Sequence, residues 1–337
     1  MNALVLHEIK NMESLKVSKI PVPVPKTGEV LIKLKAAALN HRDVWIIQGM
    51  YAKIKLPVTL GSDGTGIVEQ LGAGVDQNWI DKEVMINPAL DWGDRSAAQK
   101  MEFRILGMPD NGTQADYVVI PVENLTEKPK HLSFDEAAAL PLAGLTGYRA
   151  LFTQGKLQES QTVLLTGIGG GVATIMLQFA HAAGANIFVT SGSEEKIKKA
   201  YQYGVLGGAN YNNTDWSEQL RGLLEGREID LIVDSAGGSG FPALIDLARP
   251  GGKIVILGAT AGNPPKIDLR RIFWKQLTIQ GTTMGHSENF MEMVNFVESR
   301  QLRPILSGVY SFFDFKKAYQ CMIGGKQFGK IVLKIGE

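Results

Sequence analysis

Residues 162–173, read as TVLLTGIGGGVA, decide the fold of this chain. The segment begins with Thr162-Val-Leu-Leu165, an apolar run without alternation, which is typical of a strand buried on both faces. A run of glycines, Gly167 and Gly169–Gly171, follows at once. Behind the glycines, Val172 and the apolar residues after it return at helical spacing up to Ala183. The order of strand, glycine turn and amphipathic helix predicts the first unit of a parallel α/β sheet.

The same alternation continues downstream of the glycine turn. Further apolar runs stand at 187–189, 231–233 and 254–257, with helical segments between them. Upstream, Ser133 and Glu136 form a capping box that starts an alanine-rich helix. Strands that alternate with helices in this way predict a doubly wound parallel sheet. We therefore assign residues 126–285 to a Rossmann dinucleotide-binding domain.

The remaining segments, 1–125 and 286–337, have a different pattern. Short runs with strand character stand at 3–6, 29–35, 61–69 and 117–121, and a polar, irregular stretch at 91–112 is expected to be a surface loop. Near the end, one helical stripe lies at 290–297 and a last strand at 330–335. These two segments are predicted to form one β-rich catalytic domain that binds the substrate.

Composition excludes several classes of protein. Among the 337 residues, 35 lysines and arginines face 34 aspartates and glutamates, a net charge of +1. Such a balance gives no global footprint for nucleic acid or for an anionic membrane. The single cysteine, Cys321, allows neither a disulfide within the chain nor a thiolate cage for a metal. No apolar run reaches the ~18 residues of a membrane helix, and Met1–Lys10 lacks the features of a signal peptide. We expect a cytoplasmic protein with a small-molecule substrate.

The glycine segment is the candidate cofactor site. Its small residues follow the spacing G-x-x-G-x-x-A, a variant of the dinucleotide fingerprint. Glycines let the backbone approach a pyrophosphate, whose charge then rests on amide groups and on the helix N-terminus. Glycine turns also occur for purely structural reasons, but here strand, loop, helix and second strand stand in register. The cofactor-binding residues predicted from this segment are Gly167, Ile168, Gly169, Gly170, Gly171, Val172 and Ala173.

The end of the second strand indicates which dinucleotide is bound. An NAD site usually places an acidic residue there to hold the ribose 2′-hydroxyl. Here Ser191, Gly192 and Ser193 occupy the position, with Lys196 one helical turn later. Small hydroxyls and a lysine suit a 2′-phosphate, so NADPH is the predicted cofactor. NAD stays open as the alternative because Glu194 and Glu195 stand nearby, although they also suit the first turn of a helix.

Several stretches together carry a resemblance to a known family. They are Ala38–Asp43 (ALNHRD), Gly49–Tyr51 (GMY), Gly61–Val68 (GSDGTGIV), Asn111–Tyr117 (NGTQADY), Leu145–Tyr148 (LTGY) and the glycine segment. Across essentially the whole chain, they resemble the medium-chain dehydrogenase/reductase superfamily, most of all its zinc-free quinone oxidoreductase and enoyl reductase branch. Many such sequences are labelled zinc-type alcohol dehydrogenase-like. The resemblance implies a GroES-like catalytic domain beside the Rossmann domain.

Departures from the zinc-containing members bear on the chemistry. At the positions of their catalytic zinc ligands and the adjacent acid, this chain has Asn40, Ser62 and Asp63. The stretch 91–112 has none of the four cysteines of their structural zinc site. Zinc prefers thiolates and imidazoles. We therefore expect no metal, and His41, a single histidine, is interpreted as structural or solvent-facing.

The resemblance also implies roles for individual residues. Asn40 and Thr146 would contact the nicotinamide end of the cofactor, and Lys196 and Tyr211 the 2′-phosphate. The loop that contains Gly258 would lie along the cofactor. In the family, the strand at Leu277–Gly281 pairs with its copy in a second subunit, which implies a homodimer.

A site without a metal limits the reaction. With no Lewis acid to activate an alcohol, the expected reaction is hydride transfer to a quinone or an α,β-unsaturated carbonyl. Tyr51 is the candidate proton donor because relatives that reduce 2-enoyl substrates place a tyrosine after a similar Gly-x pair; it could instead only line the cleft. Two alternatives stay open: an NADPH-binding protein with little turnover, and a metal-dependent alcohol dehydrogenase. The sequence does not specify the substrate.

Overall fold

The structure of this chain is a computed structural model that describes residues 1–336. It divides into two compact units: unit 1 comprises residues 1–145 and those from 285 onward, and unit 2 comprises residues 146–284. The domain boundary expected from the sequence, 125/126, differs from this division. Helix α2 (Phe134–Ala138) packs on strands of unit 1. Ala138 and Ala139 are buried there against Ala36 and Val332.

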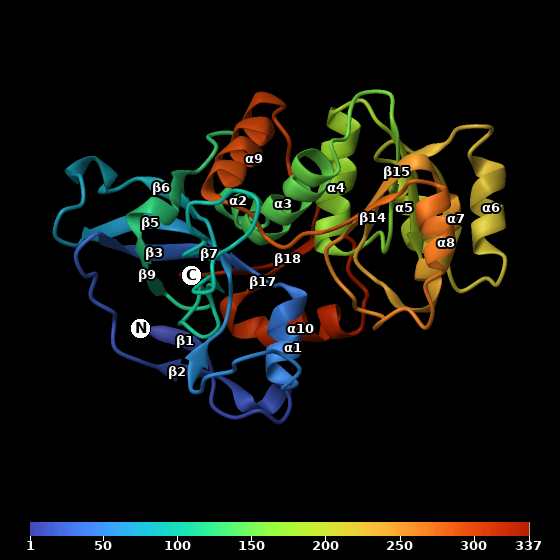
Figure 1. Cartoon of the computed structure of the whole chain (residues 1–337). Coiled ribbons are helices and arrows are strands. Elements are labelled where there is room, and N and C mark those ends of the chain that lie inside the picture. The colour runs from blue at the N-terminus through green and yellow to red at the C-terminus, as the bar shows by residue number, and fades with distance from the viewer. Residues whose placement is uncertain (337) are drawn as a thin grey trace. The chain divides into compact units, whose positions relative to one another are not determined.

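Unit 2 alternates strands and helices along the chain, from green to orange in Figure 1. Its elements are a π-helix (Arg149–Gln154), β11 (Thr162–Leu165), α4 (Gly171–Ala182), β12 (Asn186–Ser191), α5 (Glu194–Tyr201), β13 (Val205–Asn210), α6 (Trp216–Leu223), β14 (Ile229–Asp234), α7 (Phe241–Leu247), β15 (Ala248–Ile256), α8 (Leu269–Trp274) and β16 (Thr278–Gly281). The strands pair in parallel in the order β13-β12-β11-β14-β15-β16. The predicted Rossmann sheet is confirmed.

Burial explains why these segments form the sheet. All four residues of β11 are buried, and so are the last four of β14. Apolar side chains on both faces of a strand require cover on both faces, which the crossover helices of a parallel sheet provide. The strand order reverses between β11 and β14, and the carboxyl ends of these parallel strands meet at one edge of the sheet. Ligands bind at such an edge in doubly wound folds.

Unit 1 is mainly β-structure. Its strands are β1 (Asn2–Leu6), β2 (Leu15–Lys19), β3 (Glu29–Ala38), β4 (Val58–Thr59), β5 (Asp63–Leu71), β6 (Glu83–Ile86), β7 (Ala89–Leu90), β8 (Arg104–Ile105), β9 (Tyr117–Pro121), β10 (Leu125–Glu127), β17 (Leu306–Ser311) and β18 (Lys330–Lys334). Its helices are α1 (His41–Ile47), α2, α9 (Ser287–Ser299) and α10 (Phe315–Ile323), and α3 (Pro141–Tyr148) begins in it. The predicted β-rich region is confirmed.

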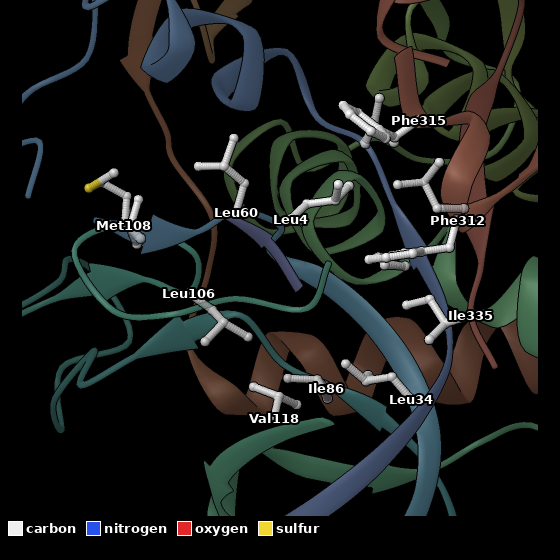
Figure 2. Packing of buried hydrophobic residues seen from close by; sticks show 14 of the residues in the cluster. Leu4, Leu34, Leu60, Ile86, Leu106, Met108, Val118, Phe312, Phe315 and Ile335 are labelled. Atoms are coloured by element: carbon white, nitrogen blue, oxygen red, sulfur yellow. The ribbon is translucent and has the colours of Figure 1, made fainter. Parts of the chain in front are cut away.

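The long strand β3 organises unit 1. It pairs along its length with β5, while its first half pairs with β9 and its last residues with β18. Because β18 lies near the end of the chain, this pairing joins distant segments at β3. The core between these strands and helices α1 and α10 contains Leu4, Leu34, Val118, Phe312 and Phe315 (Figure 2).

The stretch 91–112 is not the simple surface loop that its polarity predicted. Strands β7 and β8 form a small antiparallel pair at its base. Trp92, Leu106 and Met108 are buried, and Leu106 and Met108 join the core of unit 1 (Figure 2). The prediction failed because isolated apolar residues in a polar stretch show no periodicity, although each can anchor a loop.

None of the helices within residues 1–336 combines the length and the apolar character needed to span a bilayer.

Candidate functional site

The glycine segment forms a tight turn between β11 and α4. Gly167 has φ +70° and Gly169 has φ +111°, conformations that residues with a Cβ rarely adopt. Ile168, between them, is buried, and its N–H donates to the carbonyl of Thr190 on β12 (2.8 Å). The turn is therefore fixed to the neighbouring strand, and its glycines are required by the backbone.

Helix α4 begins directly behind the turn, with Gly170 as its N-cap. Since glycine has no side chain, it cannot satisfy the first amide groups of the helix, which remain available to an anion. Ala173 and Thr174 are buried, so the helix packs closely on the sheet. The structure thus forms the strand, turn and helix that the sequence predicted for pyrophosphate binding.

Ser191 lies where β12 ends, but its hydroxyl is already engaged. The side chain is buried and donates to the carbonyl of Ile168 (3.2 Å), and it accepts the N–H of Ser193 (3.2 Å). Ser191 therefore ties the strand end to the glycine turn, whereas the sequence interpretation had it facing a phosphate. Ser193 is the N-cap of α5 and accepts the N–H of Lys196 (3.4 Å).

Lys196 lies against the glycine turn, and Tyr211 lies against Gly192 at the end of β12. A Cβ placed on Gly169 would come within 2.5 Å of Lys196 Cδ, so the lysine side chain lies over that glycine. A Cβ placed on Gly192 would come within 2.9 Å of the Tyr211 hydroxyl. The structure therefore places Lys196 beside Gly169 and Tyr211 beside Gly192, so each residue predicted to bind the 2′-phosphate contacts a glycine of another segment.

A pocket of about 650 Å³ opens at the carboxyl ends of these strands. Its walls include Gly167, Tyr211, Trp216, Gly237 and Thr260. The volume lies in the range of cofactor sites, ~300–1,000 Å³. Its position at the edge of a doubly wound sheet is where dinucleotides bind.

Asp234, at the end of β14, was not singled out from the sequence. Its carboxylate is buried and accepts hydrogen bonds from the Thr166 hydroxyl (2.7 Å) and from the N–H groups of Ala236 and Gly237. It therefore shapes one wall of the pocket. An aspartate directly after a buried strand, followed by Ser-Ala-Gly-Gly, was the available signal.

Two further predicted cofactor residues lie in unit 2. Gly258 follows β15, and a Cβ there would stand 2.8 Å from the carbonyl oxygen of Ser235, so the close approach of these loops requires glycine. Thr146 is buried on α3, with its hydroxyl 3.8 Å from the sulfur of Met284.

In unit 1, Asn40 lies in a buried polar cluster. The ammonium of Lys330 donates to the carbonyl of Leu39 (2.8 Å), to Asn40 Oδ1 (2.7 Å) and to Asp63 Oδ2 (2.9 Å). Asn40 Nδ2 in turn donates to Asp63 Oδ2 (2.9 Å). Because an ammonium can only donate, it fixes which end of the Asn40 amide faces it. The second N–H of Asn40 Nδ2 has no hydrogen-bond partner within residues 1–336.

Arg42 forms a second buried cationic centre beside the first. One of its terminal nitrogens donates to the Ser62 hydroxyl and to the carbonyl of Leu106 (2.7 Å). Its Nε donates to the Tyr51 hydroxyl (3.2 Å), and the guanidinium carbon lies 4.9 Å from the centre of the Tyr51 ring. Neither Arg42 nor Lys330 was identified from the sequence, since neither burial nor these partners show in a one-dimensional pattern.

Asp43 is buried on the first turn of α1. Its Oδ2 accepts the N–H of Asn40 (2.9 Å), and its Oδ1 has no hydrogen-bond partner among residues 1–336. Burial raises the pKa of Asp43 to about 6, against the opposing attraction of the Arg42 charge and the hydrogen bond from Asn40. Partial burial of the ring lowers the pKa of His41, which packs edge-on against Trp45, although the residue as a whole is exposed.

Replacing Asp43 with asparagine is expected to remove a pH dependence of stability. The folded pKa of about 6 lies above the ordinary 3.8, so the stabilising contribution of Asp43 is full below about pH 4 and is lost as the pH rises to about 6. Asparagine keeps an oxygen for the Asn40 N–H but cannot ionise. The free energy of unfolding of Asp43→Asn, minus that of the wild type, should rise by about 2 kcal/mol between pH 4 and pH 6, and by about 3 kcal/mol in total from well below to well above these values. Denaturant titrations across this range measure it, and a constant difference would contradict the assignment.

Comparison with known proteins identifies the family of this chain. Residues 26–130 match the alcohol dehydrogenase GroES-like domain, and residues 171–299 match the zinc-binding dehydrogenase family. The chain is 34% identical to the zinc-type alcohol dehydrogenase-like protein YogA of Leptosphaeria maculans, over 95% of this chain and 94% of that protein. This chain belongs to the medium-chain dehydrogenase/reductase superfamily. It is an NAD(P)-dependent oxidoreductase of that superfamily.

Other members of the medium-chain dehydrogenase/reductase superfamily are similar over the full length. The crystal structure of an NAD-dependent alcohol dehydrogenase superposes with a TM-score of 0.93 at 36% identity, covering 100% of both chains. A quinone oxidoreductase of Mus musculus is 27% identical over 99% of this chain and 97% of that protein. The GroES-like fold expected for unit 1 is thereby confirmed.

The residues of unit 1 do not suit the zinc that gives one matching family its name. Within residues 1–336, no group of three or more His, Cys, Asp or Glu side chains is placed to hold a metal. Asn40 Oδ1 and Asp63 Oδ2 both accept from the Lys330 ammonium, and the Ser62 hydroxyl accepts from Arg42. A divalent cation on these oxygens would be repelled by both cations. This medium-chain dehydrogenase/reductase therefore has a donor set that does not fit catalytic zinc.

Proposed function

We propose that this protein is an NADPH-dependent reductase that transfers hydride to a quinone or an α,β-unsaturated carbonyl without a metal. The observation that carries the proposal is the pair of buried cationic side chains, Lys330 and Arg42. They bind the oxygen atoms of Asn40, Asp63 and Ser62, the positions that the family resemblance assigned to zinc chemistry. Such a site cannot offer a Lewis acid to an alcohol, but its remaining donors, one N–H of Asn40 Nδ2 and the Tyr51 hydroxyl, can stabilise a developing negative charge on oxygen.

The arrangement around the glycine turn supports NADPH. Lys196 lies over Gly169, and the Tyr211 hydroxyl lies against Gly192. A lysine ammonium and two hydroxyls, those of Tyr211 and Ser193, are the donors that a 2′-phosphate requires. Glu194 and Glu195 are exposed on the first turn of α5, where the helix dipole favours acidic residues. NADH remains the competing cofactor because the 36% identical structure is named as an NAD-dependent enzyme.

The hydrogen-bond donors of Asn40 and Tyr51 indicate the roles of these two residues in the proposed reaction. When bound, NADPH supplies the hydride. In unit 1, the second N–H of Asn40 Nδ2 can bind a carbonyl oxygen of the acceptor, because the first N–H is held by Asp63. The half-buried Tyr51 carries a hydroxyl that can give a proton to the reduced acceptor. The named activity of the mouse relative, a quinone oxidoreductase, fits this chemistry.

Reduction of a defined panel tests the proposal. The purified protein is mixed with NADPH and, in turn, 1,4-benzoquinone, 9,10-phenanthrenequinone and 2-cyclohexen-1-one, and separately with NADP⁺ and a primary alcohol. We expect oxidation of NADPH well above the rate without protein for at least one quinone or enone, and no reaction with the alcohol. A protein that binds NADPH but reduces no acceptor would be a binding protein instead. Alcohol oxidation that requires added zinc would favour a metal-dependent dehydrogenase.

We also propose that unit 2 forms a homodimer through β16. This strand ends the sheet order, so one of its edges is unpaired within unit 2. Leu269, Phe273 and Trp274 on the preceding helix α8 are exposed by 70%, 66% and 82%. An open strand edge beside exposed apolar side chains favours association with a second copy. Sedimentation equilibrium should give twice the chain mass of 36.6 kDa, and a monomer at micromolar concentration would contradict the proposal.

A further inference from the structure

We infer that Arg42 is a positioning residue that orients the Tyr51 hydroxyl and stabilises the oxygen left when this hydroxyl gives up its proton. The inference rests on the proposed function and extends it to a residue outside every role that the sequence had assigned. It concerns unit 1 alone. Three observations support the inference: the contacts of Arg42, the hydrogen bonding of the Tyr51 hydroxyl, and the neutral partners of the guanidinium.

The Tyr51 hydroxyl has one partner and one free proton. Arg42 Nε donates to its oxygen (3.2 Å), and arginine cannot accept a hydrogen bond. Among residues 1–336, the structure gives the Tyr51 O–H no acceptor. Its proton is therefore directed away from the guanidinium and is available to an acceptor molecule. The guanidinium also lies 4.9 Å from the ring centre, so it contacts the phenol by its face as well as by its oxygen.

Arg42 itself is held rigidly. It is 6% exposed, and its terminal nitrogens donate to the Ser62 hydroxyl, the Leu106 carbonyl and, at 3.5 Å, the Met108 carbonyl. Ser62 also donates to the Leu106 carbonyl (2.8 Å), which fixes its own hydroxyl. Leu106 and Met108 belong to the core (Figure 2). The guanidinium is thus anchored between helix α1 and a buried segment, and Tyr51 is placed by it.

The guanidinium of Arg42 donates only to neutral oxygens. Within the described part of the chain, no carboxylate lies within the 4.0 Å of an ion pair with it. The neighbouring Asp43 attracts its charge from a greater distance, and burial holds that carboxyl at a pKa of about 6. A buried cation bound by hydroxyls and carbonyls keeps its attraction for a negative charge. The phenolate oxygen of Tyr51 would be that charge, and the Nε contact strengthens as the proton leaves, because hydrogen bonds to ionised groups are stronger.

Tyr51 supplies the proton that the reduction requires, and Arg42 stabilises the phenolate that remains. The β-carbon of an enone accepts hydride from NADPH, and the C=C bond is reduced as an enolate forms. Tyr51 gives its proton to the enolate, NADP⁺ leaves, and solvent returns one proton to the phenolate. Arg42 stays protonated throughout. With a quinone, the hydride ends on one carbonyl oxygen, Tyr51 gives its proton to the other oxygen, and the product is the hydroquinone.

A double-mutant cycle separates this role from a structural one. The variants are Arg42→Gln, Tyr51→Phe and the double variant, assayed for kcat/KM with 2-cyclohexen-1-one, or with 1,4-benzoquinone if that is the better substrate. With Tyr51 present, Arg42→Gln should lower kcat/KM by about 10- to 100-fold. In the Tyr51→Phe background the same change should cost less than about 3-fold, since the hydroxyl through which Arg42 acts is gone.

Two controls distinguish an effect on Tyr51 from a general loss of folding or of cofactor binding. Arg95→Gln, at an exposed arginine of the same unit, should leave kcat/KM unchanged. The NADPH dissociation constant should be the same in all variants, because the pocket assigned to it lies in unit 2. If Arg42→Gln does not fold, the cycle is run with Arg42→Lys, which keeps a charge and should show a smaller loss that again vanishes in the Tyr51→Phe background.

Equal losses in both backgrounds would overturn the role of Arg42, and so would an unchanged rate for Arg42→Gln with Tyr51 present. A wild-type protein that reduces neither acceptor, nor any other in the panel, would remove the proposed function itself. The two failures are therefore distinguishable.

Discussion

Replacing Lys330 with methionine is expected to lower the free energy of unfolding by about 3–5 kcal/mol, because it removes one partner of a buried ion pair. The side chain of Lys330 is 3% exposed and that of Asp63 is 0% exposed. Without the ammonium, the Asp63 carboxylate keeps only the N–H groups of Asn40 and Leu142. A charge left uncompensated in a dry interior costs far more than the lost contact itself.

The measurement is a denaturant titration combined with amide hydrogen exchange, which localises the loss to the strands of unit 1. Lys334→Met, at an exposed lysine on the same strand β18, is the matched control and should change stability by less than about 0.5 kcal/mol. Adding Asp63→Asn to Lys330→Met should restore part of the loss, because the unpaired charge disappears. A loss that is the same with and without Asp63 would show that Lys330 acts through packing alone.

Replacing Lys196 with alanine is expected to raise the dissociation constant of NADPH by about 10- to 100-fold and that of NADH by less than about 3-fold. A charge-assisted hydrogen bond to the 2′-phosphate accounts for this range. NADH lacks that phosphate, so it loses only the packing of the lysine stem over Gly169. Quenching of protein fluorescence by each nucleotide measures both constants.

Lys198→Ala is the control for this change, since Lys198 is exposed on the same helix α5. It should leave both constants within about 2-fold of the wild type, because its charge is screened by solvent. If Lys196→Ala raised the dissociation constants of NADPH and NADH equally, Lys196 would support the glycine turn but would not bind the 2′-phosphate.

The parts of the fold that depend on local patterns could be predicted. Continuous apolar runs located β11, β12, β14 and β15, and the glycines marked the turn before α4. Gly184 follows α4 with φ +75°, as a helix-terminating glycine does. These predictions are correct because a strand that is buried on both faces requires apolar residues, and a positive φ favours glycine. The glycine-rich strand β13 was not predicted, because Gly207 and Gly208 give no apolar run.

The buried polar cluster of unit 1 could not be predicted from such patterns. Lys330 and Asn40 lie 290 positions apart in the chain, and Lys330 and Asp63 lie 267 apart. Arg42 stands between His41 and Asp43 and reads as a polar start of a helix, yet it is buried. Only the pairing of β18 with β3, and the anchoring of Leu106 and Met108, bring these groups together. The chemistry of this unit is set by tertiary contacts.

Calorimetric titration of the full chain with NADPH, and then with NADH, tests the central claim most directly. That claim is that the pyrophosphate of NADPH binds the amides of the glycine turn, while its 2′-phosphate binds Lys196 and Tyr211. We predict one site per chain and a dissociation constant for NADPH at least about 10-fold below that for NADH. The absence of any binding heat with NADPH, or tighter binding of NADH, would contradict the account.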